Sequence, residues 1–205
     1  MQIKPKLSQR PGITGEFDIT DYALGFDEDG PLWHLNIHWN AFVHFCKTLD
    51  AAQDTAKRDI ERALSSASPE DPEGCFCLEN ELEVATLADE TLTKATIFIV
   101  LCSFKEFALK ELYGQLKDAQ PLPRKKVFNR IKKTFTKMEF WPKDDNSSGR
   151  LSESAYESVR NNFAHGDWAG LKKALPELEL HDEFREVAVF LGRIAERMRS
   201  KGMNL

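Results

Sequence analysis

The sequence predicts an all-α protein: a helical bundle of about five helices with an irregular N-terminal arm. After residue 30, apolar residues recur mostly at spacings of three, four and seven, the periodicity of amphipathic helices. No segment of the body needs a strand to explain its pattern, and 205 residues suffice for one domain with a substantial core. We therefore predict an arm over residues 1–30 and a single helical domain over residues 31–205.

The predicted elements follow one another in a simple order. Residues 1–30 show no sustained period and are interrupted by proline and glycine, so they are expected to pack on the body as an irregular arm. Residues 168–180 are expected to be irregular or a short helix. The remaining expected helices cover residues 35–66, 78–116 (one helix or two nearly collinear ones), 127–138 (opened by Pro123), 152 or 154 to 165, and 184–198.

Composition narrows the class of protein. The net charge of −5 argues against a general nucleic-acid coat, and no apolar run approaches the 18 residues of a membrane span. The N-terminus lacks the apolar core of a signal peptide. The four cysteines, Cys46, Cys75, Cys77 and Cys102, lack disulfide-like spacing, which indicates a reducing compartment. We therefore predict a cytoplasmic protein without a membrane segment.

Two groups of residues deserve consideration as metal ligands. His34 and His38 lie four apart in the first helix, but no carboxylate completes a metalloprotease-like set. Packing or capping is therefore the preferred interpretation of these histidines. Cys75 and Cys77 form a lone Cys-x-Cys without a second pair, which is weak support for zinc. We predict no metal site and no cofactor.

The richest chemical pattern lies in the penultimate predicted helix. With 100° of turn per residue, Arg160, Asn161 and His165 fall within about 140° of one another, opposite an apolar stripe that includes Val159 and Phe163. Gly166 supplies the left-handed residue that commonly ends a helix, so His165 is expected in the last turn. An imidazole can take or give a proton near neutral pH.

The hexapeptide from Arg160 to His165, followed by Gly166, resembles the signature of the HEPN superfamily. This resemblance implies a small all-α protein. Many similar members are metal-independent ribonucleases of prokaryotic toxin–antitoxin or phage-defence systems. It further implies that two copies of the motif meet across a two-fold axis. We therefore expect RNA as the substrate, a homodimer, and a cognate antitoxin protein as a further partner.

Three residues are expected to support the motif. The resemblance implies an acidic residue on the long second helix near the arginine, and Glu106 is the candidate that would orient Arg160. Alternatively, Glu106 forms an ordinary i,i+4 ion pair with Lys110. Ser103 lies three residues before Glu106, and its hydroxyl should be hydrogen-bonded or part of a site. Asp167 is expected to pair with His165, which favours an acid role for the imidazole.

A basic segment lies between Pro121 and Lys143. Its charge of +7 contrasts with −12 for the rest of the chain, which is typical of a surface that handles phosphates. A solvated helix face is the alternative interpretation. Beside the Arg–His motif, we predict that this segment binds the RNA backbone. The residues assigned to this role are Lys125, Lys126, Arg130, Lys132 and Lys133.

Together these features predict a metal-independent endoribonuclease. The RNA 2′-hydroxyl serves as the internal nucleophile, His165 transfers protons, and Arg160 binds the phosphate with its planar fork of donors. Asn161 holds the imidazole or the sugar-phosphate. Because one histidine cannot easily serve both sides of an in-line displacement, a composite site in a dimer is expected. The alternative is a non-catalytic helical module that binds a nucleotide or a partner protein. Phe140 or Trp141 could stack on a base, although burial is the preferred interpretation.

Overall fold

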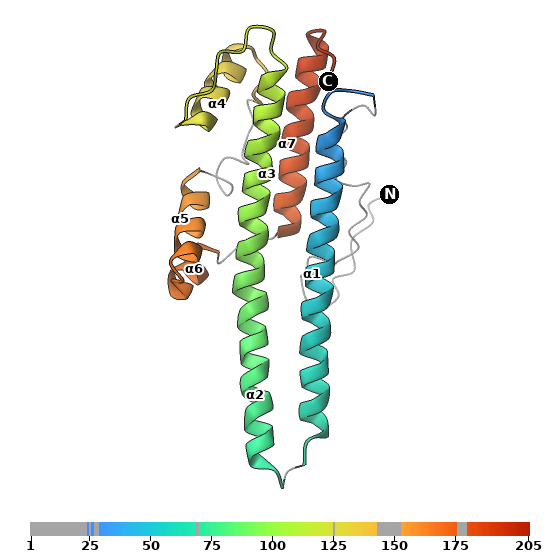
Figure 1. Ribbon diagram of the computed structural model, residues 1–205, viewed down its shortest axis with the longest axis vertical. Helices are drawn as coiled ribbons and strands as arrows, with labels where there is room; N and C mark the ends of the chain where they lie inside the picture. Colours follow the sequence, from blue (N-terminus) through green and yellow to red (C-terminus); the bar gives the residue numbers. More distant parts are fainter. Residues whose placement is uncertain are drawn as a thin grey trace.

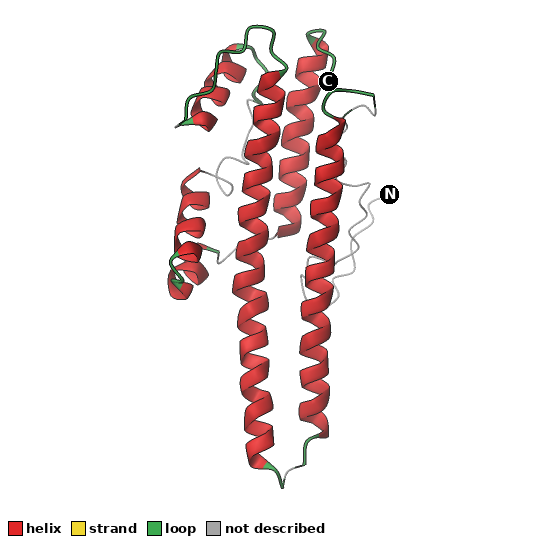
Figure 2. Cartoon of the chain, in the orientation of Figure 1, coloured by secondary structure: helices red, strands yellow, loops and turns green. Residues whose placement is uncertain are grey.

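The computed structural model describes Leu24, Phe26 and residues 29–68, 70–124, 126–142, 153–175 and 180–205. The described residues form helices and loops with no strand, so the predicted all-α class is confirmed (Figure 2). Residues 1–23 of the predicted arm lie outside the described part. Leu24 and Phe26 do not: both are buried in the core, and Asn36 Nδ2 donates to the Phe26 carbonyl at 2.8 Å.

Helix α3 (Lys94–Gly114) is the centre of the bundle. It contacts α1 (Trp33–Ser66), α4 (Val127–Lys137), α5 (Glu153–Ala164) and α7 (Leu180–Ser200). In Figure 1, α1, α3 and α7 run side by side, while α4 and α5 lie one above the other along the outer side of α3. Helix α5 is followed by the short α6 (Trp168–Ala174), which packs against it.

The core is aromatic where α1, α3 and α7 meet. The ring of Trp39 lies 4.9 Å from Phe104 and 5.4 Å from Phe184, measured between centroids. All three side chains are buried. Burial of such large apolar side chains contributes about 1.5–3 kcal/mol each, so these rings hold the three long helices together. None of the described helices has the length and apolar character that a membrane crossing requires.

The predicted helix over residues 78–116 is two helices joined by a π-helical turn. Helix α2 (Pro72–Leu87) passes through Ala88–Thr93, which is π-helical, into α3. Helix α2 begins earlier than predicted because Asp71 caps it. The Asp71 carboxylate accepts a hydrogen bond from the Gly74 amide at 3.0 Å, and Pro72 occupies the first turn. The collinear arrangement that the sequence indicated is therefore confirmed, with a different start.

Helix α4 corrects a detail of the prediction. It begins at Val127, in agreement with the predicted range of 127–138, but Pro123 does not open it, because Lys126 has a left-handed φ of 59° and interrupts the helix on the proline side. After α4 the chain turns back over the bundle, and Phe140 and Trp141 are both buried. Trp141 lies 5.0 Å from Phe190 and 5.7 Å from Phe128 between ring centroids. Burial, the preferred interpretation of these two aromatics, is thus what the structure has.

Candidate functional site

Helix α5 presents the Arg–His motif on its exposed side. Arg160, Asn161 and His165 are all exposed, whereas Val159 on the opposite face is fully buried. The amphipathic arrangement derived from the sequence is therefore correct for these residues. Phe163 departs from it, because its side chain is 36% exposed rather than part of the buried stripe.

The C-terminal end of α5 is built by a left-handed glycine. Helix α5 ends at Ala164, and His165 follows in a turn whose amide still donates to the Asn161 carbonyl at 3.0 Å. Gly166 has a φ of 66°, and its amide donates to Phe163 O at 3.2 Å. The next amide, of Asp167, donates to Asn162 O at 2.9 Å. These bonds satisfy carbonyls at the helix end and fix the position of the His165 backbone.

Tyr156 connects Arg160 to the central helix. The guanidinium carbon of Arg160 lies 5.5 Å from the centroid of the Tyr156 ring, within the range of a cation–π contact. The Tyr156 hydroxyl lies 3.4 Å from Ser103 Oγ, and Ser103 Oγ itself donates to the Ile99 carbonyl at 2.8 Å. Because the serine has a single hydrogen, which goes to that carbonyl, Tyr156 is the donor to Ser103. The predicted residues Ser103 and Arg160 are therefore linked through a tyrosine that sequence reasoning did not select.

The other two supporting residues, Glu106 and Asp167, have partners other than the arginine and histidine of the motif. Glu106 forms an ion pair with Lys110 at 2.6 Å, the alternative that its spacing had also suggested. The Asp167 carboxylate accepts a hydrogen bond from the Gly170 amide at 2.9 Å and caps α6. Asp167 therefore has a structural role at the start of α6, and its pairing with His165 stays a prediction.

The basic segment does not form one surface. Arg130 and Lys133 line a pocket together with Lys137, whereas Lys132 Nζ lies over the Trp141 ring at 5.4 Å from its centroid. Lys126 is exposed at the start of α4, and Lys125 lies outside the described residues. None of Arg160, Asn161 and His165 lines that pocket. The predicted RNA-backbone residues therefore divide between different faces of α4.

An exposed aromatic pair also lies beside the motif. Phe163 and Trp168 have ring centroids 6.4 Å apart in an edge-to-face arrangement, and Trp168 is 46% exposed. Sequence reasoning placed Phe163 in the core because it follows Val159 at helical spacing. The exposure of Phe163 is associated with the short α6. This helix folds back after Gly166 and pairs Trp168 with Phe163 at the end of α5.

The candidate metal ligands have protein partners. His34 Nε2 lies 3.3 Å from Glu111 Oε2, and His34 Nδ1 lies 3.2 Å from the Pro31 carbonyl oxygen. The His38 ring packs against Phe107 at 5.9 Å between centroids. Within the described ranges, no cluster of three or more histidine, cysteine, aspartate or glutamate side chains is arranged to hold a metal ion.

Comparison of the chain with protein-family models, with curated proteins and with solved structures finds no match.

Proposed function

We propose that the protein is a metal-independent endoribonuclease whose active centre is assembled from Arg160, Asn161 and His165 of two protomers. The observation that carries the proposal is the exposure of these three side chains at one helix end, with Arg160 held against Tyr156. An exposed arginine can bind two phosphate oxygens at once and keeps its charge. An exposed imidazole can exchange protons with the 2′-hydroxyl or the departing 5′-oxygen.

The proposal requires a second copy of the chain for two reasons. A single histidine cannot serve as both base and acid on opposite sides of the phosphorus atom. In addition, the motif lies on the exposed side of a helix end, so a partner protomer is needed to form a groove there. The exposed Phe163 and Trp168 support such an interface, because they provide apolar surface directly beside the polar groups. A toxin or anti-phage effector with a cognate antitoxin is the setting we propose for this activity.

The decisive experiment is incubation of the pure protein with total RNA in the presence of EDTA. We expect fragments that end in 2′,3′-cyclic phosphates. His165→Ala and Arg160→Ala should each lower the cleavage rate by about 10²–10⁴-fold, the usual effect of removing an acid–base or phosphate-binding group. The matched controls are His44→Ala and Arg185→Ala, which remove exposed side chains of the same types from α1 and α7.

Two outcomes contradict the proposal. Equal cleavage by wild type and His165→Ala would show that the imidazole does not act in the reaction. A strict requirement for magnesium would contradict the 2′-hydroxyl mechanism. If no RNA is cut by the wild type while a ligand or a protein co-purifies with it, the non-catalytic alternative is supported instead.

A further inference from the structure

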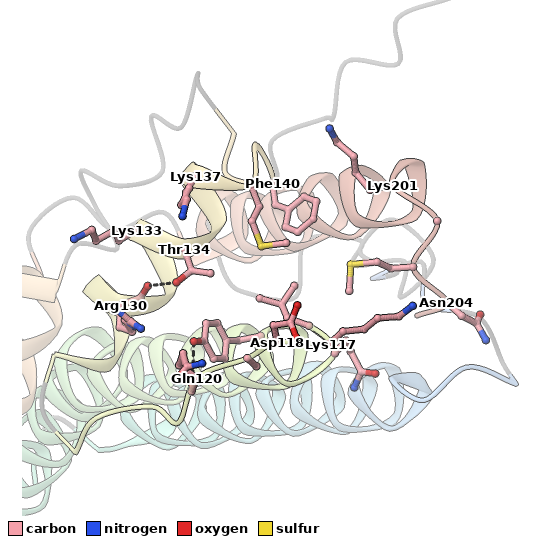
Figure 3. A pocket seen from close by; sticks show the side chains of 17 residues that line it. Lys117, Asp118, Gln120, Arg130, Lys133, Thr134, Lys137, Phe140, Lys201 and Asn204 are labelled. Atoms are coloured by element: carbon pink, nitrogen blue, oxygen red, sulfur yellow. Dashed lines mark hydrogen bonds between the residues drawn. The ribbon is translucent and has the colours of Figure 1, made fainter.

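A second candidate site lies at the opposite end of the bundle from the loop between α1 and α2. It is a pocket of about 830 Å³ between the end of α3 with its following turn, one face of α4, and the segment after α7 (Figure 3). This volume falls within the range of pockets that hold small molecules, roughly 300–1,000 Å³. No residue of the Arg–His motif takes part in it, so it is independent of the proposed ribonuclease centre.

Hydrogen bonds within the chain fix the walls of this pocket. Tyr113 Oη donates to the Gln120 carbonyl at 3.0 Å, which closes the turn after α3. Arg197 Nη1 of α7 donates to the Trp141 carbonyl at 2.7 Å, which ties α7 to the turn after α4. The Phe140 amide donates to Phe135 O at 2.8 Å and closes that turn. The pocket is therefore preformed, which lowers the entropic cost of binding.

The lining of the pocket is strongly basic. It includes one acidic residue, Asp118, against five basic ones, although the whole chain carries a net charge of −5. The basic lining residues are Lys117, Arg130, Lys133, Lys137 and Lys201. Like charges in a concave surface repel one another and raise the local positive potential. A bound anion would reduce this repulsion.

The basic side chains of the pocket come from separate elements. Arg130, Lys133 and Lys137 are spaced three and four apart and so share one face of α4, while Lys117 comes from the turn after α3. Lys201 already has a partner, since its Nζ lies 3.3 Å from Glu139 Oε2, and in Figure 3 it points outward from α7. The α4 residues and Lys117 are therefore the main donors for a ligand.

Apolar groups complete the lining. Leu116, Met138 and Met203 contribute side chains between the basic residues. A purely inorganic anion would leave this apolar surface in water. A ligand that combines phosphates with a flat or apolar portion would cover both parts of the lining.

We propose that this pocket binds a small phosphate-bearing molecule with a ring, with its phosphates against the basic face of α4 and its ring against the apolar lining. The positions of the basic residues that do not line the pocket indicate a small ligand rather than a nucleic-acid strand. Lys132 lies over Trp141, and Lys126 is at the start of α4, so the described residues of the basic segment do not provide a continuous track for a backbone.

The test measures binding by calorimetry and by thermal shift at low salt, without divalent ions. The probes are ATP, tripolyphosphate, adenosine and a twelve-nucleotide single-stranded RNA, the last measured with the His165→Ala variant so that the proposed ribonuclease centre does not cut it. We expect ATP and tripolyphosphate to bind and to raise the melting temperature, ATP to bind more tightly, and adenosine not to bind. The double variant Lys133→Glu, Lys137→Glu should weaken ATP binding by at least about tenfold, since charge-assisted hydrogen bonds are lost.

A matched double variant controls for net charge. Lys172→Glu, Lys173→Glu changes the charge by the same amount on α6, and ATP affinity should change by less than about twofold because distant exposed charges are screened. The milder pair Lys133→Gln, Lys137→Gln should also weaken binding, which guards against misfolding of the glutamate variant. Absence of ATP and tripolyphosphate binding, equal losses in the α6 control, or tighter binding of the RNA through Lys133 and Lys137 would each overturn the proposal.

Discussion

Burial separates the four thiols into two classes. Cys46 is 1% exposed and Cys102 is 8% exposed, while Cys77 is exposed and Cys75 is half-buried. Burial raises the pKa of Cys46 to about 12, and the nearby Asp50 carboxylate adds to the effect. Burial also raises the pKa of Cys102 to about 12, with Glu183 acting in the same direction and Lys105 opposing it. Both buried thiols are therefore held in the unreactive protonated form.

The raised pKa values of the two buried thiols predict a loss of folding stability at alkaline pH. Because the pKa of each buried thiol is raised from 9.0 to about 12, the folded state binds more protons than the unfolded state between these values. The free energy of unfolding should therefore fall as the pH rises above 9, by up to about 1.4 kcal/mol per pH unit for each thiol. Urea melts from pH 8 to 10.5 measure this slope. The double variant Cys46→Ala, Cys102→Ala is the control and should show a shallower slope; an unchanged slope contradicts the assignment.

At the scale of single residues, the sequence predicted which side of α5 is exposed but not which residues contact that side. Exposure follows from periodicity, because Val159 and Arg160 lie on opposite faces of the helix. The contact of Tyr156 with Ser103 could not be identified, because the two residues are 53 positions apart in the chain. The contact of Tyr156 with Arg160 spans only four residues of α5, so spacing alone could have indicated it. Glu106 was correctly recognised as able to pair with Lys110, since that pair is local. Contacts within one helix are readable from spacing, whereas contacts between helices depend on the packing.

At the scale of elements, the hairpin of α1 and α2 is the least buried part of the fold. Helix α2 has no buried residue, and from residue 51 onward α1 buries only Lys57. In Figure 1 these two helices extend well beyond the lower end of α7. Most helical stability in proteins comes from tertiary packing, which this hairpin largely lacks. The hairpin is therefore expected to open more readily than the bundle.

Hydrogen exchange measures this difference directly. We expect amides in α2 to exchange at least about 100-fold faster than those in the second half of α3, because local opening there costs less free energy than opening of the core. Helix α7 is the internal control, since its buried side chains Phe184, Leu191 and Ile194 pack in the same core as α3. Protection of α2 equal to that of α3 would show that another molecule covers the hairpin in solution.

Helix boundaries show what local sequence signals can and cannot predict. The ends of α1 and α5 agree with the sequence because Ser66 precedes a proline-rich loop and Gly166 takes the left-handed conformation. The range of α4 agrees with the prediction to within one residue, but Pro123 was wrongly expected to open the helix. Proline is a common first-turn residue, and no local pattern indicates that Lys126 adopts a positive φ. The π-helical turn at Ala88–Thr93, which contacts α1 and α6, likewise has no sequence signature.

At the scale of the whole molecule, the bundle leaves its polar motif and its basic pocket on different parts of the surface. The motif belongs to α5, and the pocket lies where α3, α4 and the segment after α7 meet. The sequence-based prediction assigned both the basic segment and the motif to RNA binding. The fold separates them, because α4 and α5 occupy successive positions along α3 (Figure 1).

The proposed composite centre makes a quantitative prediction about mixed dimers. If each cleavage needs an imidazole from both protomers, only dimers with two wild-type chains are active. When wild type is co-expressed with His165→Ala and the dimers form at random, RNA cleavage per total protein should therefore fall with the square of the wild-type fraction. Co-expression with His44→Ala is the control, since that exposed histidine on α1 is remote from the motif in the chain, and activity should stay constant. A linear fall with the His165→Ala fraction would place a complete centre in each protomer and contradict the shared site.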